Sequence, residues 1–298
     1  MAGNLKNILY RREELLENGR IPLFTGRLFR DLMRRDISLI NLSDLWKDKN
    51  GNPWEELGEI LQESLLIAAR DETLRGAKHL PLAVLAYENP EIPGQNLFGT
   101  DFLIESFQEV DFYFLERVYQ RKHKIPWRVI DTERCYLREM ALEDLPALYR
   151  LYEGEGITDF VEPLSGFKEE REYTGAYIER VYPFFGYGMW LVMDRDTHEL
   201  IGRAGLNLNE VNGEYLLEMG YIIDAGRQRR GYGTEVCQAI IAYAKEADVG
   251  FNKLHCFVQK GNLASLALLD KFQFFPEGEV LREGKEMMHF SLNLQDKF

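Results

Sequence analysis

The sequence predicts an α/β protein with two domains, and three observations support this prediction. The chain has 298 residues, which suits one large domain or two of ordinary size. Short continuous apolar runs, typical of buried strands, alternate with segments whose apolar residues recur at helical spacing. A break falls at Lys124-Ile125-Pro126, because the residue before a proline is pushed out of the helical region. We therefore expect a smaller N-terminal α/β domain over residues 1–128 and a second domain over residues 129–298.

The composition excludes several classes of protein. Apolar residues make up 45% of the chain and charged residues 29%, as in globular proteins. No run of about 18 apolar residues is present, and the first residues lack the apolar stretch of a signal peptide, so we expect no membrane segment and no secretion. Cys135, Cys237 and Cys256 are far apart in the sequence, which predicts no disulfide framework and no bound metal. A reducing, cytoplasmic location is the simplest expectation.

The charge of the chain bears on its partners. The formal net charge is −13. An acidic chain repels phosphate backbones, which argues against a nucleic-acid partner. The negative charge suits a cationic or amine-bearing substrate, and the alternative is that it serves only solubility.

In the first half, strands and helices alternate, which predicts a small open α/β layer. Asn18-Gly19 is a typical helix stop, and Asp111 is a suitable N-cap. An apolar run that ends at Tyr87 predicts a buried strand. The expected elements are helices over residues 4–16, 55–66 and 111–122 and strands over residues 80–87 and 102–104.

In the second half, three strands follow one another through short turns, which predicts a meander. Asp194-Arg195-Asp196-Thr197 and Asn212-Gly213 are the two turns. The expected strands cover residues 134–140, 188–193, 200–206, 215–223, 253–258, 279–281 and 287–292, and the expected helices cover residues 143–152, 169–182, 236–243 and 262–271.

One motif in the second half predicts a ligand-binding site. Gln228-x-x-Gly231-x-Gly233 stands between a predicted strand and a predicted helix. Glycines there let the backbone turn tightly and expose its N–H groups, which together with the positive end of the helix bind anions such as a pyrophosphate. Arg227, Arg229 and Arg230 add positive charge in an acidic domain. Two alternatives are an ordinary helix start and a dinucleotide fold, although the full GxGxxG pattern is missing.

The order of elements and three sequence blocks resemble one family. The blocks are Glu218–Ile223, Gln228–Glu235 and Asn262–Ser265. Over residues 133–293 the chain resembles the GNAT superfamily of N-acetyltransferases, and within it the ribosomal-protein N-terminal acetyltransferases. The resemblance implies a mixed, mostly antiparallel central sheet flanked by helices. It also implies direct transfer of an acetyl group from acetyl-CoA, without a metal, to a primary amine of a protein N-terminus or a small molecule.

The resemblance also implies roles for individual residues. The phosphate loop, Gln228–Glu235, would hold the pyrophosphate, and the end of the preceding strand would pair with the pantetheine arm. Asn262 would bind that arm, although it is also a good helix N-cap. Glu218, in an apolar stretch, would be the general base; the alternative is that it faces solvent or binds a substrate cation. The residues expected to bind acetyl-CoA are Ile222, Ile223, Gln228, Arg229, Arg230, Gly231, Tyr232, Gly233, Thr234, Asn262 and Ser265.

The chain departs from the family's pattern in the last predicted helix. Many relatives carry a tyrosine where this chain has Leu268-Leu269-Asp270, so a water, another tyrosine or unassisted departure of the thiolate would replace it. His255 shows no partner in the sequence. An acidic and aromatic cluster between the first two helices of this half could bind an ammonium group, the alternative being a solvated acidic face. This cluster is Glu153, Glu155, Asp159, Phe160 and Glu162.

The first half carries no comparable motif. Residues 62–125 loosely resemble the C-terminal half of a haloacid-dehalogenase-like Rossmann domain, but the aspartate-rich nucleophile loop of that superfamily is absent. We therefore expect a packing or regulatory domain there and no phosphatase activity. The alternative function for the whole chain is an acyl-CoA-sensing regulatory module without transfer activity. The acceptor, the acyl chain and the oligomeric state stay open.

Overall fold

The computed structural model describes residues 4–45, 53–97, 100–247, 249–282 and 284–295. The chain divides into two compact units, Met1–Ile125 and Pro126–Phe298, so the boundary falls at the proline that interrupts the sequence. Among the described helices, none is both long and apolar enough to cross a bilayer.

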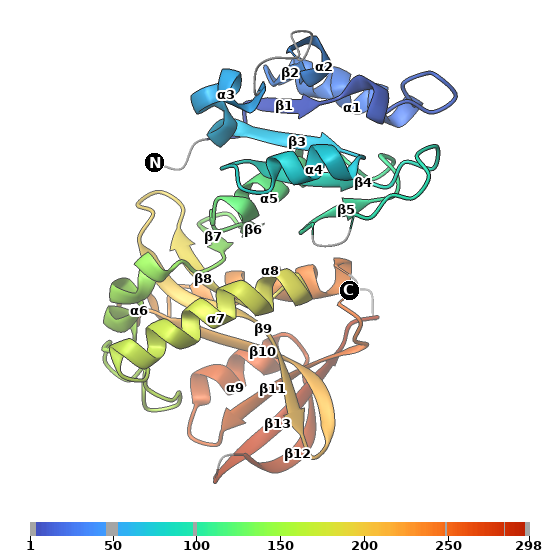
Figure 1. The fold of residues 1–298 in the computed structure, drawn as a ribbon. Coiled ribbons are helices and arrows are strands. Elements are labelled where there is room, and N and C mark those ends of the chain that lie inside the picture. Colours follow the sequence, from blue (N-terminus) through green and yellow to red (C-terminus); the bar gives the residue numbers. More distant parts are fainter. Residues whose placement is uncertain (1–3, 46–52, 98–99, 248, 283, 296–298) are drawn as a thin grey trace. The chain divides into compact units, whose positions relative to one another are not determined.

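Unit 1 is a three-layer α/β structure built on five parallel strands in the order β2-β1-β3-β4-β5 (Figure 1). Helices α1 and α5 pack on one face of this sheet, and α3 and α4 contribute to the apolar cluster on the other. The strands are β1 (Asn7–Tyr10), β2 (Ser38–Asn41), β3 (Ser64–Ala68), β4 (Ala83–Tyr87) and β5 (Leu103–Ile104). The helices are α1 (Leu23–Arg34), α2 (Leu42–Leu45), α3 (Pro53–Leu57), α4 (Asp71–Ala77) and α5 (Phe112–Lys122).

Two helices predicted for unit 1 are wrong. Residues 4–16 contain β1 and a short 3₁₀ turn, and residues 55–66 contain the end of α3, a 3₁₀ segment and the start of β3. Ile8 and Leu9 are fully buried on opposite faces of the sheet. A parallel strand covered on both faces needs apolar residues at successive positions, and such a run satisfies helical spacing equally well. The predicted strands that end at Tyr87 and Ile104 are confirmed, as is the helix capped by Asp111, whose carboxylate accepts a hydrogen bond from the N–H of Phe114.

A buried carboxylate ties β1 to β3 at the carboxyl ends of these strands. Glu14 is fully buried, and its Oε2 accepts hydrogen bonds from the N–H groups of Ala69 (2.8 Å) and Arg70 (3.0 Å). Its Oε1 accepts a bond from the Thr73 hydroxyl at 2.5 Å and lies 3.5 Å from the Arg11 guanidinium. A carboxylate that is buried with this many donors holds two strands and the start of α4 together.

We expect Glu14→Gln to destabilise unit 1 by about 2–4 kcal/mol, because the amide is uncharged and places an NH₂ group against N–H donors. Urea unfolding followed by circular dichroism measures the change. Glu13→Gln is the control, since Glu13 is exposed and neighbours Glu14 in the same turn. Equal midpoints for the two variants would contradict this role of Glu14.

Unit 2 is built on eight strands in the order β12-β13-β11-β10-β9-β8-β7-β6. Among the described strands of this sheet, only β10 and β11 are parallel neighbours. The predicted mixed, mostly antiparallel sheet flanked by helices is therefore confirmed. The strands are β6 (Arg128–Asp131), β7 (Cys135–Arg138), β8 (Met189–Asp194), β9 (Leu200–Val211), β10 (Glu214–Ile223), β11 (Lys253–Gln259), β12 (Phe275–Arg282) and β13 (Lys285–Asn293). Strand β6, which forms a hairpin with β7, was not expected from the residue pattern.

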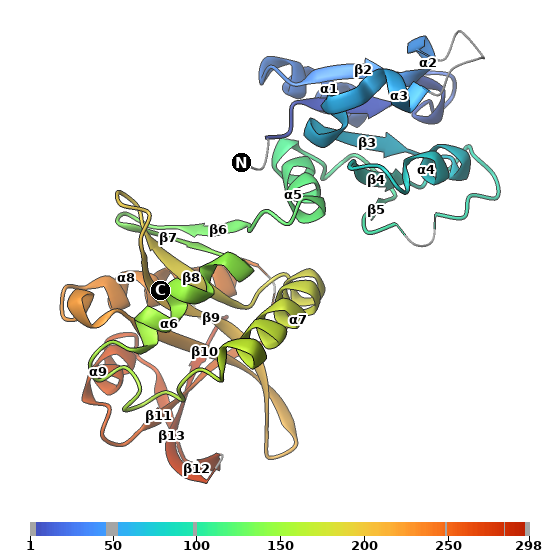
Figure 2. The ribbon, with the colours of Figure 1, turned by 60° about the vertical axis from the view of Figure 1, so that its left-hand side comes forward.

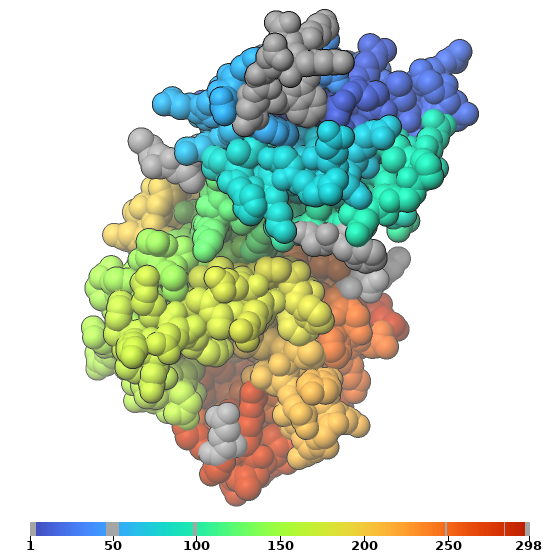
Figure 3. Space-filling model, in the orientation of Figure 1, coloured from blue at the N-terminus to red at the C-terminus, as the bar shows by residue number. Residues whose placement is uncertain are grey.

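Helices cover both faces of this sheet. Helices α6 and α7 lie on one face and α8 and α9 on the other (Figure 2). The helices are α6 (Leu145–Tyr152), α7 (Phe167–Phe185), α8 (Tyr232–Glu246) and α9 (Leu263–Lys271). Helix α7 runs past its predicted end to Phe185 and lies open along the surface of unit 2 (Figure 3).

Candidate active site

A wedge opens between β10 and β11. Glu218 and His255 are the only described pair that joins these two parallel strands, and beyond it they diverge. A cavity of about 630 Å³ lies beside the divergent end of β10 and is bounded by β10, the start of α8, helix α9 and the segment after α6. Neither Glu218 nor any residue of β11 is among the described residues that line it. The predicted cofactor residues that line it are Ile222, Ile223, Gln228, Arg229, Gly231, Gly233, Thr234, Asn262 and Ser265.

The other two predicted residues, Arg230 and Tyr232, do not line this cavity. Tyr232 is buried, and its ring lies 4.2 Å beneath the guanidinium of Arg134. Arg134 in turn donates a hydrogen bond to the carbonyl of Arg230 (3.0 Å). These contacts support the loop from behind, so the side chain of Tyr232 has a structural role.

The loop before α8 has the geometry of an anion site. Gly231 is the N-cap of α8 with φ of 85°, and Arg229 also has a positive φ of 56°. Among the described residues, no acceptor pairs with the main-chain N–H groups of Gly231, Gly233 and Thr234. Unpaired N–H groups at the positive end of a 15-residue helix attract a pyrophosphate.

Two polar side chains fix the edges of the cavity. The Gln228 amide donates to the carbonyl of Ile223 at 3.1 Å and so ties the loop to the end of β10. Asn262 is the N-cap of α9, and its side-chain oxygen accepts a bond from the N–H of Ser265 at 3.1 Å. The amide NH₂ of Asn262 has no partner within the described part of the chain, so capping leaves it available to a ligand.

These features fit acetyl-CoA. The divergent end of β10 offers backbone groups that β11 does not pair, as an extended pantetheine arm requires. The N–H groups at the start of α8 suit the pyrophosphate, and the cavity falls within the ordinary size range of ligand sites. Tyr221 also lines the cavity, and its hydroxyl is buried there.

Glu218 lies in an ionic environment, and the expectation of apolar surroundings is wrong. Its Oε2 accepts hydrogen bonds from Arg282 at 2.6 Å and from Asn209 at 2.7 Å, and its side chain is 17% exposed. Arg282 comes from β12, too far along the sequence for any local pattern to reveal the pair. Oε1 makes no hydrogen bond to the described residues, which leaves one oxygen free to take a proton.

His255 has a partner, so that expectation is also wrong. Its Nδ1 lies 2.8 Å from Nε2 of His289 on β13, and one of these nitrogens donates a hydrogen bond to the other. Burial, followed by the positive charge of neighbouring groups, lowers the pKa of His255 to about 4, and burial also lowers the pKa of His289. Both imidazoles are thus neutral at pH 7.

We expect the Tm to fall as the pH drops from about 6.5 to about 4. In this window the unfolded chain protonates a histidine of ordinary pKa (~6.5), whereas folded His255 stays neutral, so stability present above pH 6.5 is lost on acidification. Scanning calorimetry of His255→Gln should show a smaller loss than the wild type over this window. His198→Asn, at an exposed turn, is the control and should follow the wild type; identical curves for all three proteins would contradict the prediction.

The acidic cluster predicted between α6 and α7 is only partly at the cavity. Asp159 and Phe160 line it, together with other residues of the same segment. Glu153 and Glu155 do not line it, and Glu162 forms an ion pair with Lys285. Of the stretch Leu268-Leu269-Asp270, which carries no tyrosine, Leu268 lines the cavity.

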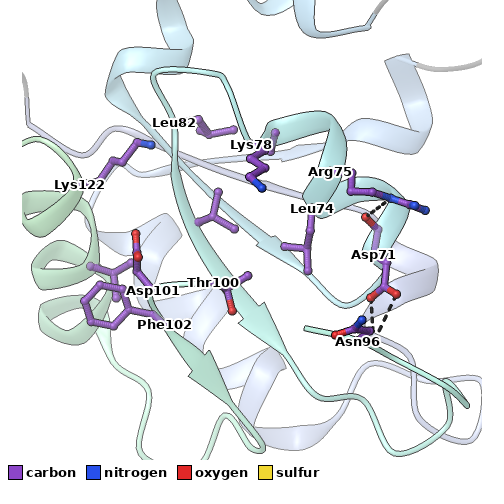
Figure 4. A pocket seen from close by; sticks show the side chains of 13 residues that line it. Asp71, Leu74, Arg75, Lys78, Leu82, Asn96, Thr100, Asp101, Phe102 and Lys122 are labelled. Atoms are coloured by element: carbon purple, nitrogen blue, oxygen red, sulfur yellow. Dashed lines mark hydrogen bonds between the residues drawn. The ribbon is translucent and has the colours of Figure 1, made fainter. Parts of the chain in front are cut away.

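A second cavity, of about 350 Å³, lies in unit 1 between α4, β4 and α5 (Figure 4). Lys78, Lys122 and Asp101 stand around it, and Asp71 accepts a bond from the N–H of Asn96. None of the predicted site residues lies there. Within the described ranges, no three His, Cys, Asp or Glu residues are grouped as a metal site would need.

Known proteins resemble unit 2. Residues 134–274 match the family model of the acetyltransferase (GNAT) domain. The uncharacterized protein YkkB of Bacillus subtilis (strain 168) is 26% identical over 143 residues, which are 47% of this chain and 81% of YkkB. The uncharacterized N-acetyltransferase YoaA of the same strain is 27% identical over 157 residues, which are 52% of this chain and 86% of YoaA.

Among solved structures, the ribosomal-protein-S5-alanine acetyltransferase from Vibrio fischeri aligns with a TM-score of 0.48 and 15% identity, over 57% of this chain and 97% of that one. The family match begins at Arg134, and the resemblance of residues 62–125 to haloacid dehalogenases finds no support. The match covers the sheet strands and helices that enclose the wedge. Unit 2 of this chain is therefore a GNAT acetyltransferase domain.

Proposed function

We propose that the protein transfers an acetyl group from acetyl-CoA to a primary amine, and that residues 129–298 form the catalytic domain. The cavity beside the divergent end of β10, with unpaired N–H groups at the start of α8, is the observation that carries this proposal. The acceptor is a protein N-terminus or a small amine. In direct transfer, the amine nitrogen forms a bond to the thioester carbonyl and the bond from carbon to sulfur breaks.

Different residues of the site bind the cofactor and transfer the proton. The phosphate loop, including Gly231 and Thr234, binds the pyrophosphate, and Asn262 with Ser265 binds the pantetheine arm. The free Oε1 of Glu218 takes the proton that the acceptor ammonium must lose before it can attack. The thiol of CoA has an ordinary pKa of about 8.5, so the thiolate can leave without a tyrosine in the stretch Leu268-Leu269-Asp270.

Calorimetric titration with acetyl-CoA tests binding, and release of CoA thiol in the presence of acceptors tests transfer. The acceptors are hexapeptides that begin with alanine or serine, spermidine and an aminoglycoside, because a protein N-terminus and a small amine are the two classes proposed. Acetylation of one class identifies the acceptor type. Binding without acetylation of any probe would contradict the proposed transfer to these amines.

A specific observation favours a second function, an acyl-CoA-sensing module. Leu268 stands where a proton donor is common, and Arg282 occupies one oxygen of Glu218. Such a module binds acetyl-CoA as tightly as an enzyme does but acetylates no acceptor, so no substitution can lower its turnover. Comparison of the wild type with Glu218→Gln separates the two functions, since only an enzyme loses turnover while keeping its affinity for CoA.

A further inference from the structure

Five side chains form a chain of contacts where β10 and β11 part, and we call them the proton-exit cluster: Glu218, Arg282, Phe257, His289 and His255. Arg282 bonds to Glu218 at 2.6 Å and lies 5.1 Å from the ring centre of Phe257. Phe257 stacks on His289 with ring centres 4.5 Å apart and planes 15° apart, and His289 bonds to His255 at 2.8 Å.

The strand pairing brings both ends of this chain together. Glu218 pairs with His255 across β10 and β11, and Phe257 pairs with His289 across β11 and β13. Residues that pair directly project to the same face of a sheet, so all four side chains share one face. His255 is 7% exposed, whereas His289 is only half-buried, so the pair leads from the interior beside Glu218 toward solvent.

We propose that the His255–His289 pair carries the proton of the acceptor amine from Glu218 to solvent, an inference that rests on the proposed function. The acceptor ammonium gives its proton to Oε1 of Glu218, and the proton passes to Nε2 of His255, the neighbour of Glu218 in the strand pairing. The proton on Nδ1 of His255 then moves across the hydrogen bond to Nε2 of His289. Nδ1 of His289 releases its own proton to water, so the number of protons balances and no oxidant or reductant is needed.

The charges that face the pair suit transfer rather than storage of the proton. Lys253 on β11 disfavours a resident positive charge on the two imidazoles, and Glu277 on β12 partly offsets it. Burial, His289 and Lys253 hold the pKa of His255 at about 4, so His255 passes on a proton that it receives. Arg282 keeps Glu218 in place through Oε2 and leaves Oε1 to the amine.

The experiment compares His289→Asn with His198→Asn, a matched change at an exposed histidine remote from the cluster. Turnover with acetyl-CoA and the best of the hexapeptide, spermidine and aminoglycoside acceptors gives kcat and KM for acetyl-CoA. We expect kcat of His289→Asn to fall at least about tenfold with an unchanged KM for acetyl-CoA, and kcat of His198→Asn to stay at the wild-type value. Added imidazole should restore kcat in His289→Ala, which a merely structural role would not allow.

A wild-type rate in His289→Asn, or a fall that imidazole leaves unchanged in His289→Ala, overturns the proposal. If either variant does not fold, the wild type is measured in mixtures of H₂O and D₂O. A plot of kcat against the deuterium fraction of the solvent should be curved, because several protons move in the relay. A straight line overturns the relay. Failure of the proposed function is a different result, since the wild type would then bind acetyl-CoA in the calorimeter and acetylate none of the acceptors.

Discussion

Gly231→Glu should weaken acetyl-CoA binding more than about 100-fold, or ~2.7 kcal/mol. Gly231 is the N-cap of α8, and its N–H is one of the unpaired donors of the anion site. A glutamate there brings a negative charge and a side chain to the place where the pyrophosphate would lie. Its Cβ would lie 3.4 Å from the Arg134 guanidinium, at the edge of ordinary van der Waals contact. Calorimetric titration measures the change in Kd.

Gly213→Glu is the matched control for this change. Gly213 has the same φ of 85°, it lies in the turn between β9 and β10, and a Cβ added there would meet no described atom within 4 Å. Both variants therefore carry the same left-handed strain of about 1–2 kcal/mol. Equal weakening of acetyl-CoA binding in the two variants would show that strain, and not occupation of the anion site, explains the effect.

The anion site could be predicted because it depends on neighbours in the sequence. Two glycines and a capping asparagine are local features, and each appears in the structure where the sequence places it. Helix α8 begins at Tyr232, four residues before the expected start. Tyr232 shows the limit of such reasoning, since its position in the motif does not reveal that its side chain turns into the core beneath Arg134.

The surroundings of Glu218 could not be predicted, because they depend on strands that are distant in the sequence. Neither the ion pair with Arg282 nor the contact of His255 with His289 exists before β12 and β13 fold against β11. The same reason explains the two wrong helices in unit 1, where partners in the parallel sheet decide the structure of Ile8 and Leu66. Local spacing cannot separate a doubly covered strand from a helix.

Glu218→Gln should lower kcat about 100-fold or more while leaving the Kd for acetyl-CoA unchanged within about twofold. The amide cannot take the proton of the acceptor ammonium, and general base catalysis contributes about 10²–10⁴-fold to a rate. The substituted side chain still accepts a hydrogen bond from Arg282, so the fold of the wedge should persist. Steady-state turnover at saturating acetyl-CoA and calorimetric titration measure the two quantities on the same preparation.

Asp144→Asn separates loss of a base from loss of an ion pair. Asp144 bonds to Arg138 at 2.6 Å and its side chain is 17% exposed, which matches the pair of Glu218 and Arg282 in length and exposure. Asp144 lies in the turn before α6, whereas Glu218 lies on β10 where that strand meets β11. Both variants weaken one partly buried ion pair and should lose similar stability, whereas only Glu218→Gln should lose turnover. If Asp144→Asn loses turnover to the same degree, the rate depends on the rigidity of unit 2 and Glu218 is not the base. If neither variant loses turnover, the proton leaves through water alone and the histidine pair has no proton to carry.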